Sequence, residues 1–209
     1  MIPTLQAEGY EVIAAQLCLD SQVADVAAAK RTLGRVSSPA ILSATLMAVP
    51  SSPLLEPMIA LSGWFTSPRS LPMLMKPCRA SSTSTPHQSS GHIEVADGRV
   101  WMLPEGAKDF AGDLPEEEQK VVWATHFASD ADLFNQKVDG TAWKSKPSWS
   151  IVATEDRTVH PDLERFLAKR MGATTVAVKS SHVAMLSQPQ LVIDVIRKAA
   201  RAALAKVAA

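Results

Sequence analysis

The sequence predicts a single α/β domain with a mainly parallel sheet flanked by helices. The first observation is that short apolar segments alternate with helix-like segments over the last third of the chain. The second is size and composition: 209 residues, 46% hydrophobic and 20% charged, suffice for one core and are too apolar for general disorder. The third is that no internal repeat is visible, which argues against a repeat array.

The N-terminal part predicts helices that alternate with strands. Four elements are expected there: a helix over 1–7, a strand over 10–15, a helix from Asp20 or Ser21 to Leu33, and a strand over 39–42. Gly9 and Gly34 follow the two helices, where glycine commonly ends a helix. A short polar side chain at Asp20 or Ser21 is suited to cap the second helix.

The elements expected after residue 91 have clearer signals. They are a hairpin over 92–103, a helix that opens after Leu114, strands over 148–154 and 174–178, and helices over 161–171 and 188–207. Asp97-Gly98 suits the hairpin turn because both residue types tolerate positive φ. Pro115 and the acids at 116–118 suit a helix N-terminus, and Gly172 suits a helix end.

Charge and cysteine usage exclude several classes of function. Lys and Arg (21) balance Asp and Glu (21), and no basic tract predicts nucleic-acid or membrane-surface binding. No apolar run is long enough for a membrane-spanning helix, and the first nine residues lack the pattern of a signal peptide. Cys18 and Cys78 stand in unlike contexts and predict neither a metal site nor a disulfide. A reducing cytoplasmic location is expected, and the oligomeric state is not predicted.

Residues 43–90 differ in composition from the rest of the chain. Glu56 is the only acidic residue there, while the segment holds 7 of the 14 prolines and 4 of the 8 methionines. No helical or strand period runs through it, because proline recurs too often for a long element. A Ser/Pro-rich linker or lid is one interpretation, but its density of large apolar residues is unusual for a linker.

Two polar segments follow predicted strands, where open α/β sheets place their sites. Asp156 lies in the segment after the strand at 148–154, and His182 lies in the segment after the strand at 174–178. A histidine exchanges protons near neutral pH, and an acid beside it fixes its tautomer. The plainer interpretation is that Asp156 caps a solvated turn and His182 is an ordinary loop histidine. Their order and topology favour an acid–base pair.

The segments 146–157 (KPSWSIVATEDR) and 180–186 (SSHVAML) resemble the end of an α/β-hydrolase, closest to a capped bacterial branch related to plant methyl esterases and hydroxynitrile lyases. The resemblance covers 1–42 and 92 to the C-terminus. It implies a catalytic triad in which Asp156 is the acid and His182 the base, after a serine nucleophile. It implies a small ester-like substrate and neither a metal nor an organic cofactor.

The resemblance also divides the single domain, 1–209, into four parts. They are an N-terminal core part over 1–42, the aberrant segment over 43–90, a cap over 91–145 and a C-terminal core part over 146–209. The cap is expected over a mainly apolar pocket for an acyl or alcohol group. Trp101, Trp123 and Phe127 are candidate walls of that pocket, although an ordinary core position is the favoured interpretation for each.

Two departures from the family pattern concern the reacting groups. The family begins with a strand and a His-Gly loop that supplies an oxyanion donor, and this chain starts beyond that loop, so a truncated N-terminus is expected. The strand at 39–42 should lead into Gly-X-Ser-X-Gly, and no such motif occurs anywhere in the sequence. Ser43 follows that strand without the flanking glycines of a nucleophile elbow.

A single nucleotide lost after the Leu42 codon would account for the aberrant segment. If the codons for 43–53 are translated from the third base of the first codon, they can encode Gly-His-Ser-Tyr-Gly-Gly-Ala-Val-Ile-Thr. In the same frame, the codons for 63–68 can encode a further core strand. Part of this match is forced, since the Met47–Ala48 junction must give Gly and the Met75–Lys76 junction must give Glu. The hypothesis is out-of-frame translation over 43–90, with the frame restored near Gly91. The alternative is a genuine divergent lid.

The expected function is that of an esterase-like serine hydrolase whose nucleophile has been lost. Such a chain should be inactive, because His182 and Asp156 act only together with the serine. The alternatives are a non-catalytic remnant or binding protein, or a gene-model artefact without a stable fold. A third interpretation, with Ser180 or Ser181 as nucleophile, is disfavoured because neither lies on an elbow.

Overall fold

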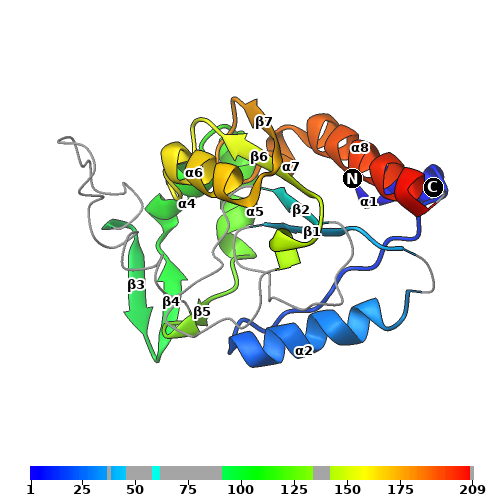
Figure 1. Ribbon diagram of the computed structural model, residues 1–209. Coiled ribbons are helices and arrows are strands. Elements are labelled where there is room, and N and C mark those ends of the chain that lie inside the picture. The colour runs from blue at the N-terminus through cyan, green and yellow to red at the C-terminus, as the bar shows by residue number, and fades with distance from the viewer. Residues whose placement is uncertain (37–38, 46–57, 62–90, 134–141, 208–209) are drawn as a thin grey trace.

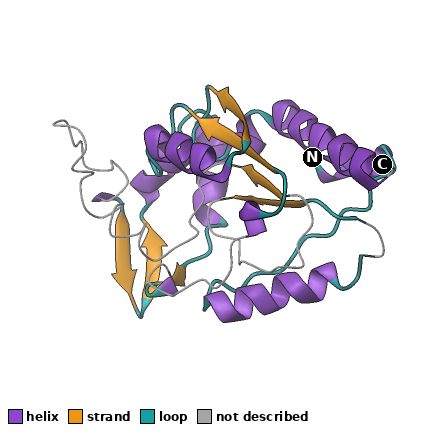
Figure 2. Cartoon of the chain, viewed as in Figure 1, coloured by secondary structure: helices purple, strands orange, loops and turns teal. Residues whose placement is uncertain are grey.

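The computed structural model describes residues 1–36, 39–45, 58–61, 91–133 and 142–207. These residues form a four-stranded parallel sheet with helices on both faces and a separate three-stranded antiparallel sheet beside it (Figures 1 and 2). The Ser/Pro-rich run near residue 85 and the strand proposed to be hidden at 63–68 lie outside the described residues.

The parallel sheet has the order β1-β2-β6-β7. Its strands are β1 (Leu42–Thr45), β2 (Met58–Leu61), β6 (Ser148–Ala153) and β7 (Thr174–Val178). Every neighbouring pair is parallel, with Ala153 opposite Val178 at the ends of β6 and β7. The carboxyl ends of all four strands therefore lie at one edge of the sheet, where the loops after β6 and β7 meet.

Strand β6 is buried along its whole length because helices cover both of its faces. Trp149 and Ile151 point to one face and pack against α8 (Pro189–Val207). Successive strand residues face opposite sides, and Leu42 of β1 shares the other face, where Leu167 of α6 (Pro161–Met171) packs. The core thus has two halves, one on each side of β6.

Helix α6 begins and ends at residues suited to those positions. The His160 side chain accepts a hydrogen bond from the Asp162 N–H, and Pro161 occupies the first turn. Gly172 ends the helix with φ 62°, a left-handed conformation that glycine adopts without strain. With both ends of α6 defined in this way, the residues that face the sheet are defined as well.

The N-terminal helices are tied to distant parts of the chain. Helix α1 (Ile2–Ala7) lies beside α8 (Figure 1), and Glu8 forms a salt bridge with Arg197 of that helix. Helix α2 (Gln22–Leu33) is capped by the Ser21 hydroxyl, which accepts from the Ala24 N–H at 3.2 Å. Both helices have the positions expected from the sequence.

The antiparallel sheet and short helices occupy the part of the chain expected as a cap. The sheet comprises β3 (Ile93–Ala96), β4 (Arg99–Met102) and β5 (Ser129–Asp130). The short helices there are α4 (Ala107–Phe110), α5 (Glu116–Ala124) and the 3₁₀ turns Pro104–Gly106 and Ala142–Lys144, and a further short helix outside this part, α7 (Ala184–Ser187), follows the His182 loop. Asp97 and Gly98 have φ values of 51° and 72°, the left-handed turn expected for the hairpin.

Two expectations for the first 90 residues were wrong. Residues 10–15 are not a strand: they pair with none of the described strands, and Ile13 is exposed. The strand expected at 39–42 instead begins at Leu42 and ends at Thr45. Strand β2, four residues long and beside β6, lies within 43–90, where the sequence shows no strand period and proline excludes only a long element. A short apolar run becomes a strand only where a neighbour supplies hydrogen-bond partners, and the sequence does not reveal that neighbour.

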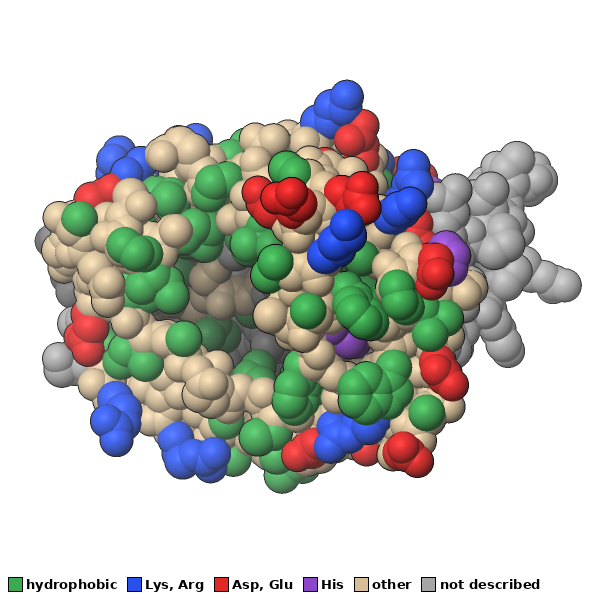
Figure 3. Space-filling view, turned by 180° about the vertical axis from the view of Figure 1, so that it is seen from behind, with side chains coloured by type: hydrophobic (Ala, Val, Ile, Leu, Met, Phe, Trp, Pro, Cys, Tyr) green, Lys and Arg blue, Asp and Glu red, His purple; other side chains and the backbone are tan. Residues whose placement is uncertain are grey.

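The surface carries charges of both signs. On the face shown in Figure 3, Lys and Arg alternate with Asp and Glu around the margin, and hydrophobic side chains border a hollow near the centre. Among the described residues, no helix combines the length and apolarity needed to cross a membrane.

Because β6 is packed on both faces, a cavity in it should strongly lower the free energy of unfolding. Ile151 has no exposed surface, so Ile151→Ala should lower the free energy of unfolding by about 2–5 kcal/mol. Val23→Ala is the matched control, because Val23 is 79% exposed on α2 and its truncation should change stability by at most about 0.5 kcal/mol. Urea denaturation followed by circular dichroism measures both. Equal effects of the two substitutions would contradict this packing.

Candidate active site

The loops after β6 and β7 continue to pair beyond the sheet. The Thr154 N–H donates to the Val178 carbonyl at 2.8 Å, and the Glu155 N–H donates to the Ser180 carbonyl at 3.0 Å. This pairing holds the two loops together just where Asp156 and His182 follow. The position of both residues is therefore a direct result of strand register.

Asp156 and His182 form a buried pair. His182 Nδ1 lies 2.7 Å from Asp156 Oδ2, and neither side chain has exposed surface. A carboxylate only accepts hydrogen bonds, so the proton of this contact is on Nδ1 and the imidazole donates it. The sequence expectation that these two side chains face each other agrees with this geometry.

Backbone groups fix the other oxygen of Asp156. Its Oδ1 accepts hydrogen bonds from the Thr158 N–H at 2.7 Å and the Val159 N–H at 2.9 Å. These two donors orient the carboxylate, and they satisfy a charge that burial would otherwise make costly. The remaining oxygen is directed at the imidazole.

Residues from the expected cap complete the surroundings of His182. The Phe110 ring, at the end of α4, lies with its centroid 4.6 Å from that of the imidazole. Leu114 and Val183 pack in the same apolar cluster, which joins the start of the α5 region to the His182 loop. The imidazole is thus enclosed by an aromatic side chain that is far away in sequence.

Ser180 and Ser181 hold the His182 loop in place. The Ser181 hydroxyl donates to Asp113, and the Ser180 hydroxyl donates to the Ser181 carbonyl at 2.8 Å. Burial alone would raise the pKa of Asp113, but hydrogen bonds from Ser181 and Ser187 outweigh it and hold that pKa below its usual value. A carboxylate with a low pKa is a weak base, so this contact orients the Ser181 hydroxyl and does not activate it.

A second acid–histidine contact links the antiparallel region to the Asp156 loop. His92 Nδ1 lies 2.7 Å from Oδ2 of the buried Asp109, and Arg157 lies 3.9 Å from the other oxygen of Asp109. Arg157 directly follows Asp156 in sequence. The same loop therefore carries the buried acid and an exposed ionic contact to the neighbouring region.

Glu164 is a buried carboxyl group on α6 that sequence analysis missed. Its side chain is adjacent to the end of β6, where Oε2 accepts a hydrogen bond from the Ala153 N–H at 2.8 Å. Burial, together with the negative charge of Asp156, raises the pKa of Glu164 to about 9. It is therefore protonated at neutral pH. The available signal was a carboxylate in helical register with the apolar residues Leu167 and Ala168.

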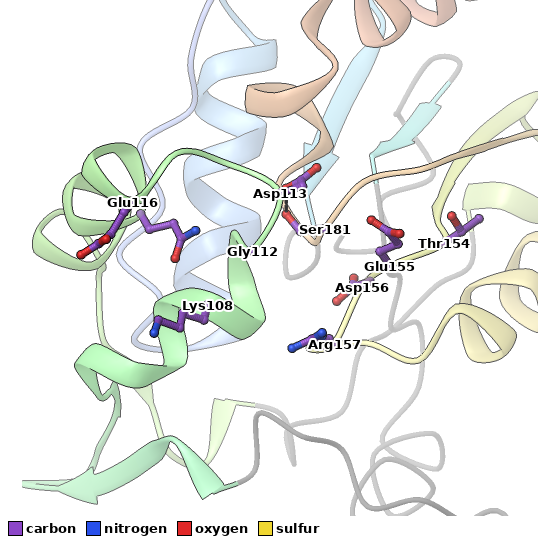
Figure 4. A pocket seen from close by; sticks show the side chains of 10 residues that line it. Lys108, Gly112, Asp113, Glu116, Thr154, Glu155, Asp156, Arg157 and Ser181 are labelled. Atoms are coloured by element: carbon purple, nitrogen blue, oxygen red, sulfur yellow. Dashed lines mark hydrogen bonds between the residues drawn. The ribbon is translucent and has the colours of Figure 1, made fainter.

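A pocket of about 690 Å³ opens beside Asp156. Figure 4 shows it between the segment that holds Lys108 and Asp113 and the loops after β6 and β7. Most of its lining is polar or charged: Lys108, Gly112, Asp113, Glu116, Gln119, Thr154, Glu155, Asp156, Arg157 and Ser181. Within the described residues, no three His, Cys, Asp or Glu side chains are grouped as metal ligands.

The expectation that three aromatic side chains line the pocket was wrong for this pocket. Trp101, Trp123 and Phe127 are 45%, 43% and 58% exposed, and none of them lines it. The Trp123 indole donates to the Met102 carbonyl at 3.1 Å, which holds its ring against β4. The region over 91–145 is small and has few core positions, so these large side chains remain at its surface. They are therefore neither pocket walls nor ordinary core residues.

Comparisons with known proteins agree with this architecture. The sequence model of the alpha/beta hydrolase family matches residues 15–195. A search among curated proteins found no match. Solved structures with a similar fold include three that are each less than 25% identical to this chain.

The first is the pyrethroid hydrolase PytH with BIF, with TM-score 0.74, 19% identity, and coverage of 97% of this chain and 90% of that one. A pyrethroid hydrolase from Sphingobium faniae has TM-score 0.72, 20% identity, and coverage of 94% and 88%. Polyneuridine aldehyde esterase has TM-score 0.67, 15% identity, and coverage of 94% and 90%.

The raised pKa of Glu164 predicts a pH-dependent difference between the wild-type chain and Glu164→Gln. An exposed glutamate titrates near 4.5, whereas folded Glu164 titrates near 9. Between these values the unfolded chain has lost a proton that the folded chain keeps, so wild-type stability falls as pH rises, by up to about 1.4 kcal/mol per unit. Glutamine has no such dependence.

The stability of Glu164→Gln relative to wild type should therefore increase between about pH 5.5 and about pH 7.5, by about 2–3 kcal/mol. Urea denaturation at the two pH values measures it. Asp162→Asn, an exposed change on the same helix, is the control: it keeps Glu164, so its stability relative to wild type should be nearly the same at the two pH values. A constant difference between wild type and Glu164→Gln would mean that Glu164 is ionised in the folded chain.

Proposed function

Because this chain belongs to the α/β hydrolase family, we propose that Asp156 and His182 are the acid and base of a serine-hydrolase site for esters or similar acyl bonds of small molecules. The observation that carries the proposal is their contact at 2.7 Å, with both side chains fully buried at the ends of neighbouring parallel strands. The names of a pyrethroid hydrolase and a polyneuridine aldehyde esterase among the similar structures favour ester-like substrates.

The geometry supports a defined task for each member of the pair. Asp156, which two backbone N–H groups fix in place, accepts the hydrogen bond from the Nδ1–H group of His182. Its negative charge stabilises the imidazolium. The opposite ring nitrogen, Nε2, is the one that takes the proton of an attacking serine and returns it to the leaving group. The acyl chemistry itself needs the serine and donors for the developing oxyanion.

We further propose that the chain as written does not carry out this reaction. No Gly-X-Ser-X-Gly motif occurs in its 209 residues. Ser43 lies inside β1, between Leu42 and Ala44, and a serine within an extended strand does not form the exposed turn of a nucleophile elbow. The Ser181 hydroxyl donates a hydrogen bond to Asp113. The chain thus retains an acid and a base without a nucleophile that they can serve.

The region over 91–145 is proposed as the cap of this site. Its Phe110 lies against the His182 ring, and its Asp113 accepts the Ser181 hydroxyl, so it closes directly over the buried pair. The polar pocket between this region and the strand-end loops is the opening toward solvent. An ester enters such a site as a neutral molecule, and its polar carbonyl suits a lining of this kind.

The missing motif leads to a prediction about the gene. One frame away from residues 43–48, its codons should spell Gly-His-Ser-Tyr-Gly-Gly or a close variant, because the Met47–Ala48 junction can give only Gly in that frame. Resequencing across the codons for 42–92 tests this directly. Codons that cannot encode a glycine-flanked serine would overturn the frame hypothesis and favour a genuine divergent segment.

The absence of a nucleophile predicts an activity difference between two proteins. The chain as written should not hydrolyse p-nitrophenyl acetate or butyrate above background. A repaired chain should do so at least about a hundredfold faster, once it has the restored frame and an upstream strand with an oxyanion loop. Release of p-nitrophenol, followed by absorbance, measures both.

Two histidine variants serve as controls in that assay. His182→Ala should abolish turnover by the repaired chain, whereas His160→Asn should preserve it, because His160 is an exposed helix cap that asparagine can replace. The second variant reports any non-specific attack by surface imidazole. Clear His182-dependent turnover by the unrepaired chain would show that another residue, Ser43 or Ser181 first, is the nucleophile.

A further inference from the structure

Glu164 connects α6 to the strand that carries the catalytic acid. The side chain is 2% exposed, and its Oε2 accepts the Ala153 N–H at 2.8 Å. Ala153 is the last residue of β6, and Asp156 follows three residues later. A carboxyl group is thus placed between a helix and the root of the Asp156 loop.

The second oxygen of Glu164 determines the protonation state of the group. Among the described residues, no donor lies within hydrogen-bond reach of the buried Oε1. A buried carboxylate with an unsatisfied oxygen is costly, whereas a protonated carboxyl becomes a donor at that oxygen. The Asp156 side chain is within hydrogen-bonding range and is an acceptor.

The charges around Glu164 agree with a neutral acid. Asp156 is the negative group that faces it, and its charge opposes ionisation of Glu164. Arg165 favours ionisation, but it lies on the exposed side of α6, where it donates to Asp162 at 2.8 Å. This cation is therefore paired with Asp162 on the solvent side, where water screens its charge.

We propose that Glu164 is a positioning residue that, as a neutral acid, donates a hydrogen bond to Asp156 and so holds the carboxylate on His182. This inference rests on the proposed function, because it assigns to Glu164 a role in the Asp156–His182 pair. Asp156 then receives hydrogen bonds from the Thr158 and Val159 N–H groups, from His182 and from Glu164. Together these hydrogen bonds hold the carboxylate in one orientation.

A merely structural role for Glu164 gives a different expectation. If the side chain served only to join α6 to β6 through the Ala153 N–H, its removal would lower stability without altering the Asp156–His182 hydrogen bond. The Nδ1 proton of His182 reports that hydrogen bond directly, because its NMR resonance moves downfield as the contact to the carboxylate strengthens. The readout requires no turnover, so it applies to the chain as it exists.

The test compares wild type, Glu164→Gln, Glu164→Leu and the exposed control Asp162→Asn by NMR of chains labelled at histidine and at glutamate carboxyl carbons. In wild type, the Glu164 carboxyl carbon should have the chemical shift of a protonated acid at neutral pH and should titrate near pH 9. Glutamine can both donate to Asp156 and accept from Ala153, so Glu164→Gln should leave the His182 Nδ1 proton resonance near its wild-type position. Asp162→Asn should also leave it there.

Glu164→Leu removes the donor, and the His182 Nδ1 proton resonance should move upfield, because a carboxylate that Glu164 no longer holds on His182 makes a weaker contact with the imidazole. If Glu164→Leu does not fold, the pH series replaces it: the wild-type resonance should move as Glu164 ionises, and the Glu164→Gln resonance should not. An ionised Glu164 at neutral pH, or a resonance unchanged in folded Glu164→Leu, overturns the proposal.

The failure of this inference is distinguishable from failure of the proposed function. An inactive repaired chain would contradict the function while these resonances still showed whether Glu164 positions Asp156. An active repaired chain with an unmoved resonance would keep the function and remove Glu164 from it.

Discussion

The parallel register of β6 and β7 is the constraint on which the site depends. Ala153 stands opposite Val178, and the hydrogen bonds continue past the strands through Thr154 and Glu155. The acid and the histidine, 26 positions apart in sequence, leave the sheet at the same edge as a result. Helices on both faces exclude water from β6, which makes the contact of the pair strong and the position of each partner fixed.

Elements with local signals could be predicted from the sequence. Helix α6 has proline at its start and glycine at its end, and β7 is a short apolar run with clear limits, so both match the expected bounds. The order of strands and the two strand-end segments then placed Asp156 and His182 together. In these cases the signal lies within a few residues of the element itself.

The remaining features depend on partners that are distant in sequence. The residues at 10–15 have strand composition but pair with none of the described strands, and β1 begins where its expected strand was to end. Phe110 and Asp113 contact the His182 loop from another part of the chain, and the sequence around them has no pattern that predicts the contact. Glu164 gave a weak signal, because an acid in register with apolar helix residues is unusual but has several explanations.

The Asp109–Arg157 contact has a consequence for the response of the molecule to salt. Arg157 is 59% exposed, so dissolved ions screen its attraction to Asp109, whereas the Asp156–His182 contact has no exposed surface and is shielded from them. Rising ionic strength should therefore loosen the attachment of the antiparallel region to the Asp156 loop while the buried pair persists. The two neighbours, Asp156 and Arg157, would then belong to parts of the protein with different sensitivity to the same solvent.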